Sequence, residues 1–326
     1  MNHDDPDKAV LREQAPFAST LRQGDSTEPT VEELLADRFR VQERVGHGGM
    51  GVVYRATDIV LERPVAIKVL RSHIGQNHAL VARFFREAKI IAQLSSNPSI
   101  VTLYDIGQTA SGSPYLVMEY LDGQTLRSVI AAARTSEMRL SRTYVLDIAL
   151  QIAVALQDAH GAGVIHRDLK PANVVVVKSR VFPHLVKVLD FGIALSIGSP
   201  LPREFATETG TFVGTPRYAA PEFFDDQEAT SASDMYALGL ILYELANNAF
   251  PLQAKSFFGW LRAHTSDVPS PFLPADPPYP TMVQELTLSM LDKNPKNRPD
   301  ARETARILQA AQDQIEQAKR KLWAQD

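Results

Sequence analysis

The sequence predicts an α+β fold in two lobes, a small β-rich lobe followed by a larger and mainly helical one. Short runs of β-branched residues follow one another between residues 38 and 70, and helical periodicity predominates after Gly123. The 326 residues are 44% hydrophobic and 22% charged, as in a globular chain with a sizeable core. We expect the hinge between the two lobes at residues 119–123.

Composition narrows the classes of partner and location. The formal net charge of −4 gives no bulk attraction to nucleic acid or to a membrane surface, so neither partner is expected. The chain has no cysteine, which excludes disulfides and thiolate metal sites and fits a reducing compartment. Its first residues lack the apolar core of a signal peptide, and its longest apolar stretch, residues 236–246, is too short to span a bilayer. These observations predict a cytoplasmic protein with no membrane segment.

The chain divides into three expected parts. Residues 1–37 lack sustained periodicity and are expected to form a flexible N-terminal tail. Residues 38–310 carry the folded domain, with an N-lobe at 38–120 and a C-lobe at 121–310. Residues 311–326 are rich in alanine, glutamine and charge and are expected to form a helical extension.

Five strands and one helix are expected in the N-lobe. The runs RFRVQERV, VVYRAT and VAIKVL predict a largely antiparallel sheet, and IVTLYDIG and PYLVMEY predict two further strands. Between them, ALVARFFREAKIIAQL has helical periodicity. In the C-lobe, YVLDIALQIAVALQDAHGAG predicts a long amphipathic helix that ends in glycines. DMYALGLILYELA is apolar nearly all round and predicts a buried central helix, whereas the proline-rich residues 266–280 predict a loop.

Glycines interrupt the first predicted hairpin, in the stretch VGHGGMGVVYRATD. Gly46, Gly48 and Gly51 stand within a strand pattern that glycine weakens. Two interpretations fit these residues. The hairpin needs a flexible backbone, or it forms a lid whose bare backbone lies close to phosphate groups. The G-x-G-x-x-G spacing alone does not decide between them.

A glutamate stands on the apolar stripe of the first predicted helix. Glu87 follows Phe84 by three residues and precedes Ile91 by four, so its carboxylate faces inward and needs a cation. One candidate is Arg83, one turn earlier on the same helix. The other is Lys68, which stands among apolar neighbours in the strand VAIKVL and would meet Glu87 between sheet and helix.

Further along, VIHRDLKPANVVVV gathers charged and amide side chains just before a strand. Asn173 closes this group, and seventeen residues later Asp190 leaves another strand in VLDFG. An aspartate followed by glycine can be an ordinary turn former. Two hard oxygen ligands at strand ends instead suit Mg²⁺, which takes its other ligands from phosphate and water. Asp168 stands apart from both and is placed to accept a proton.

The motifs GHGGMGVVY, VAIK, the helix glutamate, HRDLKPANV, DFG and GTPRYAAPE occur in this order. This ordered set resembles the eukaryotic-type (Hanks-type) serine/threonine protein kinases, and its glycine loop and hinge are similar to those of bacterial members. The resemblance covers roughly residues 38–308. It implies the bilobal protein kinase fold, with the kinase domain at residues 38–310, and transfer of the ATP γ-phosphoryl group to serine or threonine hydroxyls of proteins. It also favours the phosphate-lid interpretation of the glycines.

The resemblance implies a role for each residue of the site. Lys68 holds the α- and β-phosphates and Glu87 orients it, Asp168 accepts the substrate hydroxyl proton, and Lys170 neutralises the transferring group. Mg²⁺, or alternatively Mn²⁺, is held by Asn173 and Asp190. The implied nucleotide-binding residues are Val45, Gly46, His47, Gly48, Gly49, Met50, Gly51, Val52, Val53, Ala66, Lys68, Met118, Glu119, Leu121 and Val175.

Other residues are implied to be structural. Ile91, Leu103, His166 and Phe191 match an apolar stack that joins the lobes, and Asp234 anchors it from the central helix. Glu222 of GTPRYAAPE pairs with Arg298 of NPKNRP as a buried ion pair, the alternative being separate surface contacts for each.

Activation and acceptor class also follow from the resemblance. Arg167 is expected to bind a phosphate on the activation segment, and Thr207 and Thr209 are the expected sites of trans-autophosphorylation in a transient kinase dimer. The lysine of DLKPAN and Thr215 favour serine/threonine acceptors over tyrosine. Two other functions stay open: a pseudokinase scaffold that binds nucleotide and partners without transfer, and a small-molecule phosphotransferase that shares the lobes.

Overall fold

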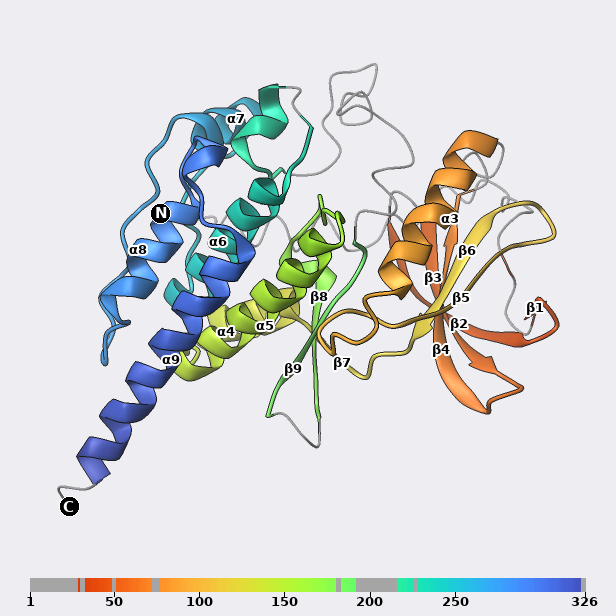
Figure 1. The fold of residues 1–326 in the computed structure, drawn as a ribbon, viewed down its shortest axis with the longest axis horizontal. Coiled ribbons are helices and arrows are strands. Elements are labelled where there is room, and N and C mark those ends of the chain that lie inside the picture. Colours follow the sequence, from red (N-terminus) through yellow and green to blue (C-terminus); the bar gives the residue numbers. More distant parts are fainter. Residues whose placement is uncertain are drawn as a thin grey trace, which may run out of the picture.

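The computed structural model describes residue 29 and residues 33–48, 51–71, 77–179, 183–191, 216–225 and 228–323. A strand-rich N-lobe and a helical C-lobe lie side by side, with the short strands β7, β8 and β9 between the two (Figure 1). The predicted α+β class is confirmed by this arrangement.

The N-lobe is a six-stranded antiparallel sheet in the order β1-β2-β3-β4-β6-β5. The strands run Leu34–Leu35 (β1), Phe39–Gly48 (β2), Gly51–Asp58 (β3), Arg63–Leu70 (β4), Leu103–Gln108 (β5) and Pro114–Glu119 (β6). The five predicted strands are present. The sequence missed β1, which is two residues long and pairs with β2 ahead of the expected domain start at residue 38.

The two faces of this sheet bury different side chains because neighbouring residues of a strand point to opposite faces. On β3, Val52 and Tyr54 belong to a core cluster on one face. Val53 packs with Ala66 and Met118 in the cluster of the other face, which also contains residues of α3 (His78–Ala92). Val53, Ala66 and Met118, which the sequence analysis assigns to nucleotide binding, therefore share one face of the sheet.

Helix α3 lies against the sheet through a stripe at helical spacing. Its buried residues are Val81, Phe84, Ala88 and Ile91. Asn77 caps its N-terminus by accepting hydrogen bonds from the backbone of Ala79 and Leu80, which satisfies two otherwise unpaired N–H groups.

The C-lobe is built around α6 (Ser231–Asn247), in which every residue from Asp234 to Asn247 is buried. This confirms the central position predicted from its apolar sequence. Helix α5 (Arg142–Gly161) packs against both α6 and α9 (Ala301–Trp323). The remaining helices are α4 (Leu126–Thr135), α7 (Phe257–Thr265) and α8 (Thr281–Met290), with short 3-10 turns at Pro171–Asn173, Pro221–Asp225 and Pro295–Asn297. The small sheet has the order β7-β8-β9, from Gly123–Thr125, Val174–Val177 and Leu185–Val188.

Helix α9 does not break at residue 310, where the sequence placed the end of the folded domain. It runs continuously to Trp323, and Ala311 and Ile315 are buried in the main core. The charged composition of this segment reflects its solvent face, while Ala311 and Ile315 continue the buried face of the helix. In the described ranges, no helix joins enough length with enough apolar character to cross a membrane.

The predicted ion pair between Glu222 and Arg298 is present and buried. Two guanidinium nitrogens of Arg298 donate to the two carboxylate oxygens of Glu222, each at 2.8 Å, and the Ser233 hydroxyl donates to the same carboxylate. Burial raises the pKa of Glu222, but the hydrogen bonds from Arg298 and Ser233 outweigh it and hold that pKa below its usual value. This pair fastens the short turn at residues 221–225 to the body of the C-lobe.

Replacing Arg298 with methionine should destabilise the protein by about 3–5 kcal/mol, because it leaves the Glu222 carboxylate buried without its cation. Urea unfolding at several pH values measures this loss. In the wild type the pair stabilises fully above the ordinary glutamate pKa of 4.5, and its contribution falls as pH drops through the lowered folded pKa. In the variant the Glu222 pKa rises, so acid relieves the defect and the difference in stability narrows from pH 7 to pH 4. A difference that stays constant over this range would contradict the assignment.

Candidate active site

The predicted catalytic residues converge between the two lobes. Asp168, Lys170 and Asn173 lie in the loop between α5 and β8, and Asp190 follows β9. Lys68 reaches this loop region from β4 of the N-lobe, where it contacts Asp190. Residues more than a hundred positions apart thus form one cluster.

The backbone of the catalytic loop is held by the buried side chain of Asp234 in α6. One carboxylate oxygen accepts from the backbone N–H of His166 at 2.8 Å and lies 2.8 Å from Nε2 of His160, and the other accepts from the N–H of Arg167 at 2.9 Å. Asp234 is 1% exposed, so these groups replace water as its hydrogen-bond partners. Arg167 adopts a left-handed backbone with φ of 65°. Such strain persists where surrounding contacts hold it, as these bonds do.

His166 joins the loop to the strand that leads to Asp190. Its Nε2 lies 2.8 Å from the carbonyl oxygen of Leu189, and its Nδ1 lies 3.3 Å from the backbone nitrogen of Asp168. A neutral imidazole with the proton on Nε2 satisfies both contacts. The ring packs on Phe191 with 4.8 Å between centroids, and both side chains are buried, as the expected apolar stack requires.

Asp168 is fixed by two neighbours on its own loop. The Lys170 ammonium donates to both carboxylate oxygens of Asp168, at 2.9 and 2.7 Å. The Asn173 amide nitrogen donates to the Asp168 carbonyl at 2.8 Å and to its carboxylate at 3.1 Å. These contacts hold the carboxylate in one orientation while its side chain remains 44% exposed, as a group that meets an incoming substrate must be.

The predicted pair of Lys68 with Glu87 is not the contact that the structure contains. The Lys68 ammonium instead donates to Asp190 at 2.6 Å. Burial raises the pKa of Asp190, but the charge and hydrogen bond of Lys68 outweigh it and keep that pKa below its usual value. Asp190 has a left-handed backbone with φ of 56°, which directs its carboxylate from the end of β9 toward the lysine.

Glu87 is held by two arginines. Its carboxylate lies 3.6 Å from Arg83 on the preceding turn and 3.9 Å from Arg167 of the catalytic loop. The Arg83 contact is the alternative that the helix spacing offered. Glu87 lies at the edge of the buried stripe of α3 rather than within it, and its side chain is 20% exposed, so these arginines can reach it.

The two proposed metal ligands offer the right atoms. Because the amide nitrogen of Asn173 is engaged with Asp168, its oxygen is the atom that a cation could use. Asp190 adds an ionised carboxylate. In the part of the chain that the structure describes, no three histidine or acidic side chains gather as a metal cage. Two protein oxygens fit a magnesium ion that takes its other ligands from phosphate and water.

Four predicted adenine-pocket residues come from four strands. Val53 of β3, Ala66 of β4 and Met118 of β6 lie on one face of the N-lobe sheet, with Ala66 directly opposite Met118. Val175 lies on β8 of the small sheet and is 7% exposed. Leu121 lies half-buried between β6 and β7. Their placement around the interlobe region suits a planar apolar ligand.

The glycine hairpin is only partly described. Gly46 faces Val53, and a Cβ on it would meet no atom of the described chain closer than 3.9 Å, so packing does not require glycine there. A Cβ on Gly51 would lie 2.2 Å from the carbonyl oxygen of Val69, so the sheet itself requires this glycine. Packing within the sheet therefore explains Gly51 but not Gly46, so at Gly46 both interpretations stay open. Gly49 and Met50 lie outside the described residues.

Val52 is placed differently from the prediction. Its side chain belongs to the core cluster of the opposite sheet face, because it alternates with Val53 along β3. Only the backbone of Val52 could therefore contact a nucleotide. Val45 and His47 of β2 are exposed, and Gly48 ends that strand.

The sequence interpretation missed a buried lysine beside the hinge. Lys187 of β9 is 7% exposed, and its ammonium lies 2.6 Å from a carboxylate oxygen of Glu119. The signal was present, because Lys187 stands among apolar residues in HLVKVLD just as Lys68 does in VAIKVL. The N–H of Glu119 donates to Thr102 O at 3.0 Å.

A second missed cluster holds the segment that follows residue 215. Glu244 of α6 is 2% exposed and accepts hydrogen bonds from Arg134 at 2.7 Å, from Arg217 at 3.2 Å and from the hydroxyl of Tyr218. Burial and the neighbouring Glu244 carboxylate raise the pKa of Tyr218 far above its usual value, so this hydroxyl keeps its proton. The cluster fixes residues 217 and 218 to α4 and α6.

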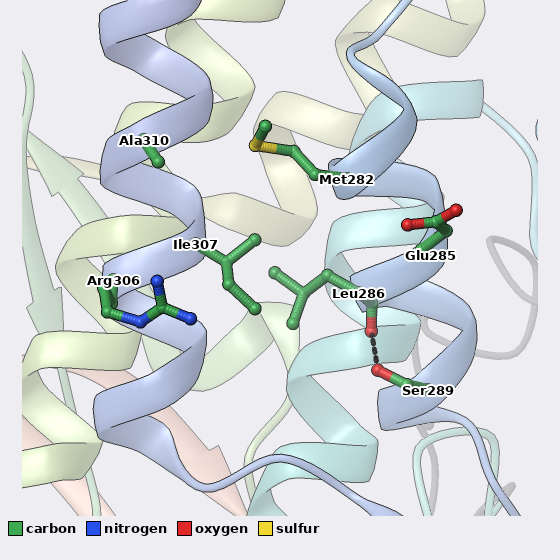
Figure 2. A pocket seen from close by; sticks show the side chains of 7 residues that line it. All are labelled: Met282, Glu285, Leu286, Ser289, Arg306, Ile307 and Ala310. Carbon is green, nitrogen blue, oxygen red and sulfur yellow. Dashed lines mark hydrogen bonds between the residues drawn. The ribbon is translucent and has the colours of Figure 1, made fainter.

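Several predicted positions cannot be placed. Thr207, Thr209 and Thr215 lie outside the described residues. A groove between α8 and α9 is separate from the site (Figure 2), and Ile307 and Leu286 face each other across it. Neither helix carries a residue of the catalytic cluster, so this groove has no part in the chemistry considered below.

Comparisons with known proteins agree with this geometry. Residues 39–308 match the family model described as protein kinase domain. The chain is 38% identical over 279 residues to the serine/threonine-protein kinase pkn3 of Myxococcus xanthus, covering 85% of this chain and 50% of that protein. It is 37% identical over 275 residues to the serine/threonine-protein kinase PknA of Mycobacterium tuberculosis, covering 83% of this chain and 60% of that protein.

A solved structure shares the fold. The crystal structure of the Mycobacterium tuberculosis PknI kinase domain matches with a TM-score of 0.62 and 25% identity, over 87% of this chain and all of that one. The chain spans about half to three fifths of the length of the two curated relatives above. With the family model, the catalytic cluster and the bilobal fold in agreement, the chain belongs to the protein kinase family, and its relatives are bacterial serine/threonine kinases.

Proposed function

We propose that the chain is an ATP-dependent protein kinase that phosphorylates serine and threonine hydroxyls. The observation that carries the proposal is the arrangement of Asp168, which Lys170 and Asn173 hold in one orientation while the carboxylate stays accessible. A scaffold that only binds partners has no need for an exposed carboxylate fixed at this point. The names of the relatives support the same activity.

Phosphoryl transfer needs positioning and charge cancellation more than covalent chemistry. ATP with Mg²⁺, or alternatively Mn²⁺, supplies the γ-phosphoryl group and part of the charge neutralisation. Asp168 orients the acceptor hydroxyl and takes its proton, while the Lys170 ammonium offsets negative charge on the transferring group. Asn173 and Asp190 hold the metal through oxygen atoms, and Lys68 binds the α- and β-phosphates. The apolar walls formed by Val53, Ala66, Met118 and Val175 enclose the adenine.

The acceptor class follows from the catalytic loop and the anchored segment after residue 215. Lys170 stands two residues after Asp168, as in the serine/threonine kinases that the loop resembles. Arg217 and Tyr218 are fixed by Glu244, which supports a rigid platform for a peptide substrate. Such a platform favours a protein acceptor over a small molecule. The expected partner is a protein substrate that binds this platform transiently. The cytoplasmic location of the protein stays a prediction.

Autophosphorylation would activate the protein by changing the partners of the charged side chains described above. In this structure Arg167 lies beside Glu87, and Lys68 is paired with Asp190. A phosphate dianion on Thr207 or Thr209 would bind the Arg167 guanidinium more strongly than a carboxylate 3.9 Å away does. Glu87 would then exchange Arg167 for Lys68, and Asp190 would be left to its metal. Because one copy phosphorylates the threonine of another copy, a transient dimer forms during this step.

The Asp168→Asn variant should lose at least roughly 10³-fold in kcat while its affinity for ATP changes no more than a few-fold, since Asp168 meets the hydroxyl and not the nucleotide. Peptide phosphorylation and calorimetric titration with ATP and Mg²⁺ measure the two quantities separately. Equal activity in variant and wild type would remove Asp168 from its role. Wild-type transfer to small alcohols but to no peptide would favour the small-molecule phosphotransferase, and nucleotide binding with no transfer at all would favour the pseudokinase scaffold.

The Thr207→Ala/Thr209→Ala double variant should gain fewer phosphates than the wild type during incubation with ATP and Mg²⁺ and should phosphorylate peptides several-fold more slowly. Intact-mass measurement counts the phosphates, and initial rates before and after the incubation give the activation. The matched control is Thr135→Ala, which removes an exposed threonine hydroxyl bonded only to the backbone of α4. A double variant with the same phosphate count and rate as the wild type would place the activating site elsewhere.

A further inference from the structure

The ion pair between Lys187 and Glu119 joins two segments whose relative position matters for the proposed chemistry. Lys187 lies on β9, whose chain reaches Asp190 three residues later. Glu119 is the last residue of β6 and begins the link between the lobes. One end of the pair therefore belongs to the strand that presents the metal ligand, and the other to the segment expected to contact adenine.

The contacts around this pair are dense. A single carboxylate oxygen of Glu119 lies 2.6 Å from the Lys187 ammonium and accepts from the backbone N–H of Thr102 at 2.7 Å. Lys187 also lies 3.5 Å from the carbonyl oxygen of Ile100. The lysine and glutamate side chains are 9% and 19% exposed, so solvent screens the pair little.

Residues 99–102 bind both partners through their backbone. Val188, next to Lys187, donates its N–H to Ser99 O at 2.8 Å and accepts from the N–H of Val101 at 3.1 Å. The carbonyl of Thr102 accepts from the backbone N–H of Glu119 at 3.0 Å, and the N–H of Thr102 donates to the Glu119 carboxylate. The charge pair thus closes a connection from β6 through residues 99–102 to β9.

Stability alone does not require charges at this position. A buried ion pair costs desolvation of both groups, and well-packed apolar residues of similar size stabilise a core as well or better. What the pair adds is a fixed orientation of the Glu119 carboxylate, because this group accepts from both an ammonium and a backbone N–H. That orientation helps to hold the backbone of Glu119, which begins the segment expected to contact adenine.

We propose that Lys187 is a positioning residue for the nucleotide, acting through Glu119 on the backbone of the link between the lobes. The inference rests on the proposed function, because it assigns the ligand of this link as the adenine of ATP. Lys187 touches neither adenine nor phosphate in this assignment. It keeps the adenine contact and the metal ligand at a constant separation.

The test is a comparison of variants of the full chain. Lys187→Met keeps most of the side-chain length and removes the charge, and Lys187→Arg keeps the charge. We expect Lys187→Met to raise the KM for ATP and the calorimetric Kd for ADP about fivefold or more, the effect of one misplaced hydrogen bond, with the KM for peptide unchanged. Lys187→Arg should restore most of the affinity. Glu119→Gln should show the same shift, and combining it with Lys187→Met should add little, because both remove one connection.

A control separates positioning from general destabilisation. Arg38→Met removes the guanidinium that pairs at 2.7 Å with the fully buried carboxylate of Asp58, elsewhere in the N-lobe. It should lower the melting temperature without changing the KM for ATP. Lys187→Met with wild-type KM and Kd, or a Kd shift equal to that of Arg38→Met, would overturn the inference. The Kd for ADP tests the inference even if no peptide is phosphorylated. A failure to phosphorylate any peptide would count against the proposed function instead. Should Lys187→Met fail to fold, Glu119→Gln carries the same test.

Discussion

A single buried carboxylate determines the geometry of the catalytic loop. Asp234 in the fully buried helix α6 accepts hydrogen bonds from two consecutive backbone N–H groups of the loop, those of His166 and Arg167. Fixing these N–H groups holds Arg167 in a left-handed conformation, and the chain then continues to Asp168 in the orientation that Lys170 and Asn173 complete. Burying the carboxylate is costly unless every acceptor is used, and here the loop supplies the donors. The rigid C-lobe core therefore sets the position of the reactive carboxylate.

In contrast, the charges contributed by the N-lobe are able to exchange partners. Lys68 is paired with Asp190, and Glu87 lies between Arg83 and Arg167, so four of the groups assigned to phosphate binding and activation are satisfied by one another. The contacts of Glu87 are longer than that of Lys68 with Asp190 and leave it partly exposed. In the proposed activation Glu87 would exchange Arg167 for Lys68, and Asp190 would be left to its metal. We therefore propose that the fixed loop serves catalysis and that these pairs serve regulation.

Much of the fold could be predicted because local patterns and tertiary packing agree. The β-branched runs became strands, and the all-round apolar stretch became the central helix α6. The pairing of Glu222 with Arg298 is implied by the resemblance to the kinase family, and the structure contains it. What the sequence could not decide is the choice between competing partners: Glu87 had Arg83 and Lys68 as candidates. In the structure Glu87 lies beside Arg83 and Arg167, and Lys68 contacts Asp190. The extension expected after residue 310 is helical and continues α9 without a break, but its charged composition does not reveal the buried Ala311 and Ile315.

The central claim is that the fixed Asp168 carboxylate directs transfer of a phosphoryl group to serine or threonine side chains of proteins. Its most direct test is to incubate the purified chain with ATP, Mg²⁺ and a mixed peptide library that contains serine, threonine and tyrosine in equal proportion. Mass spectrometry then assigns each phosphate to a residue. The account predicts phosphate on serine and threonine and essentially none on tyrosine. Phosphate confined to tyrosine, or ATP hydrolysed with no phosphopeptide formed, would contradict it.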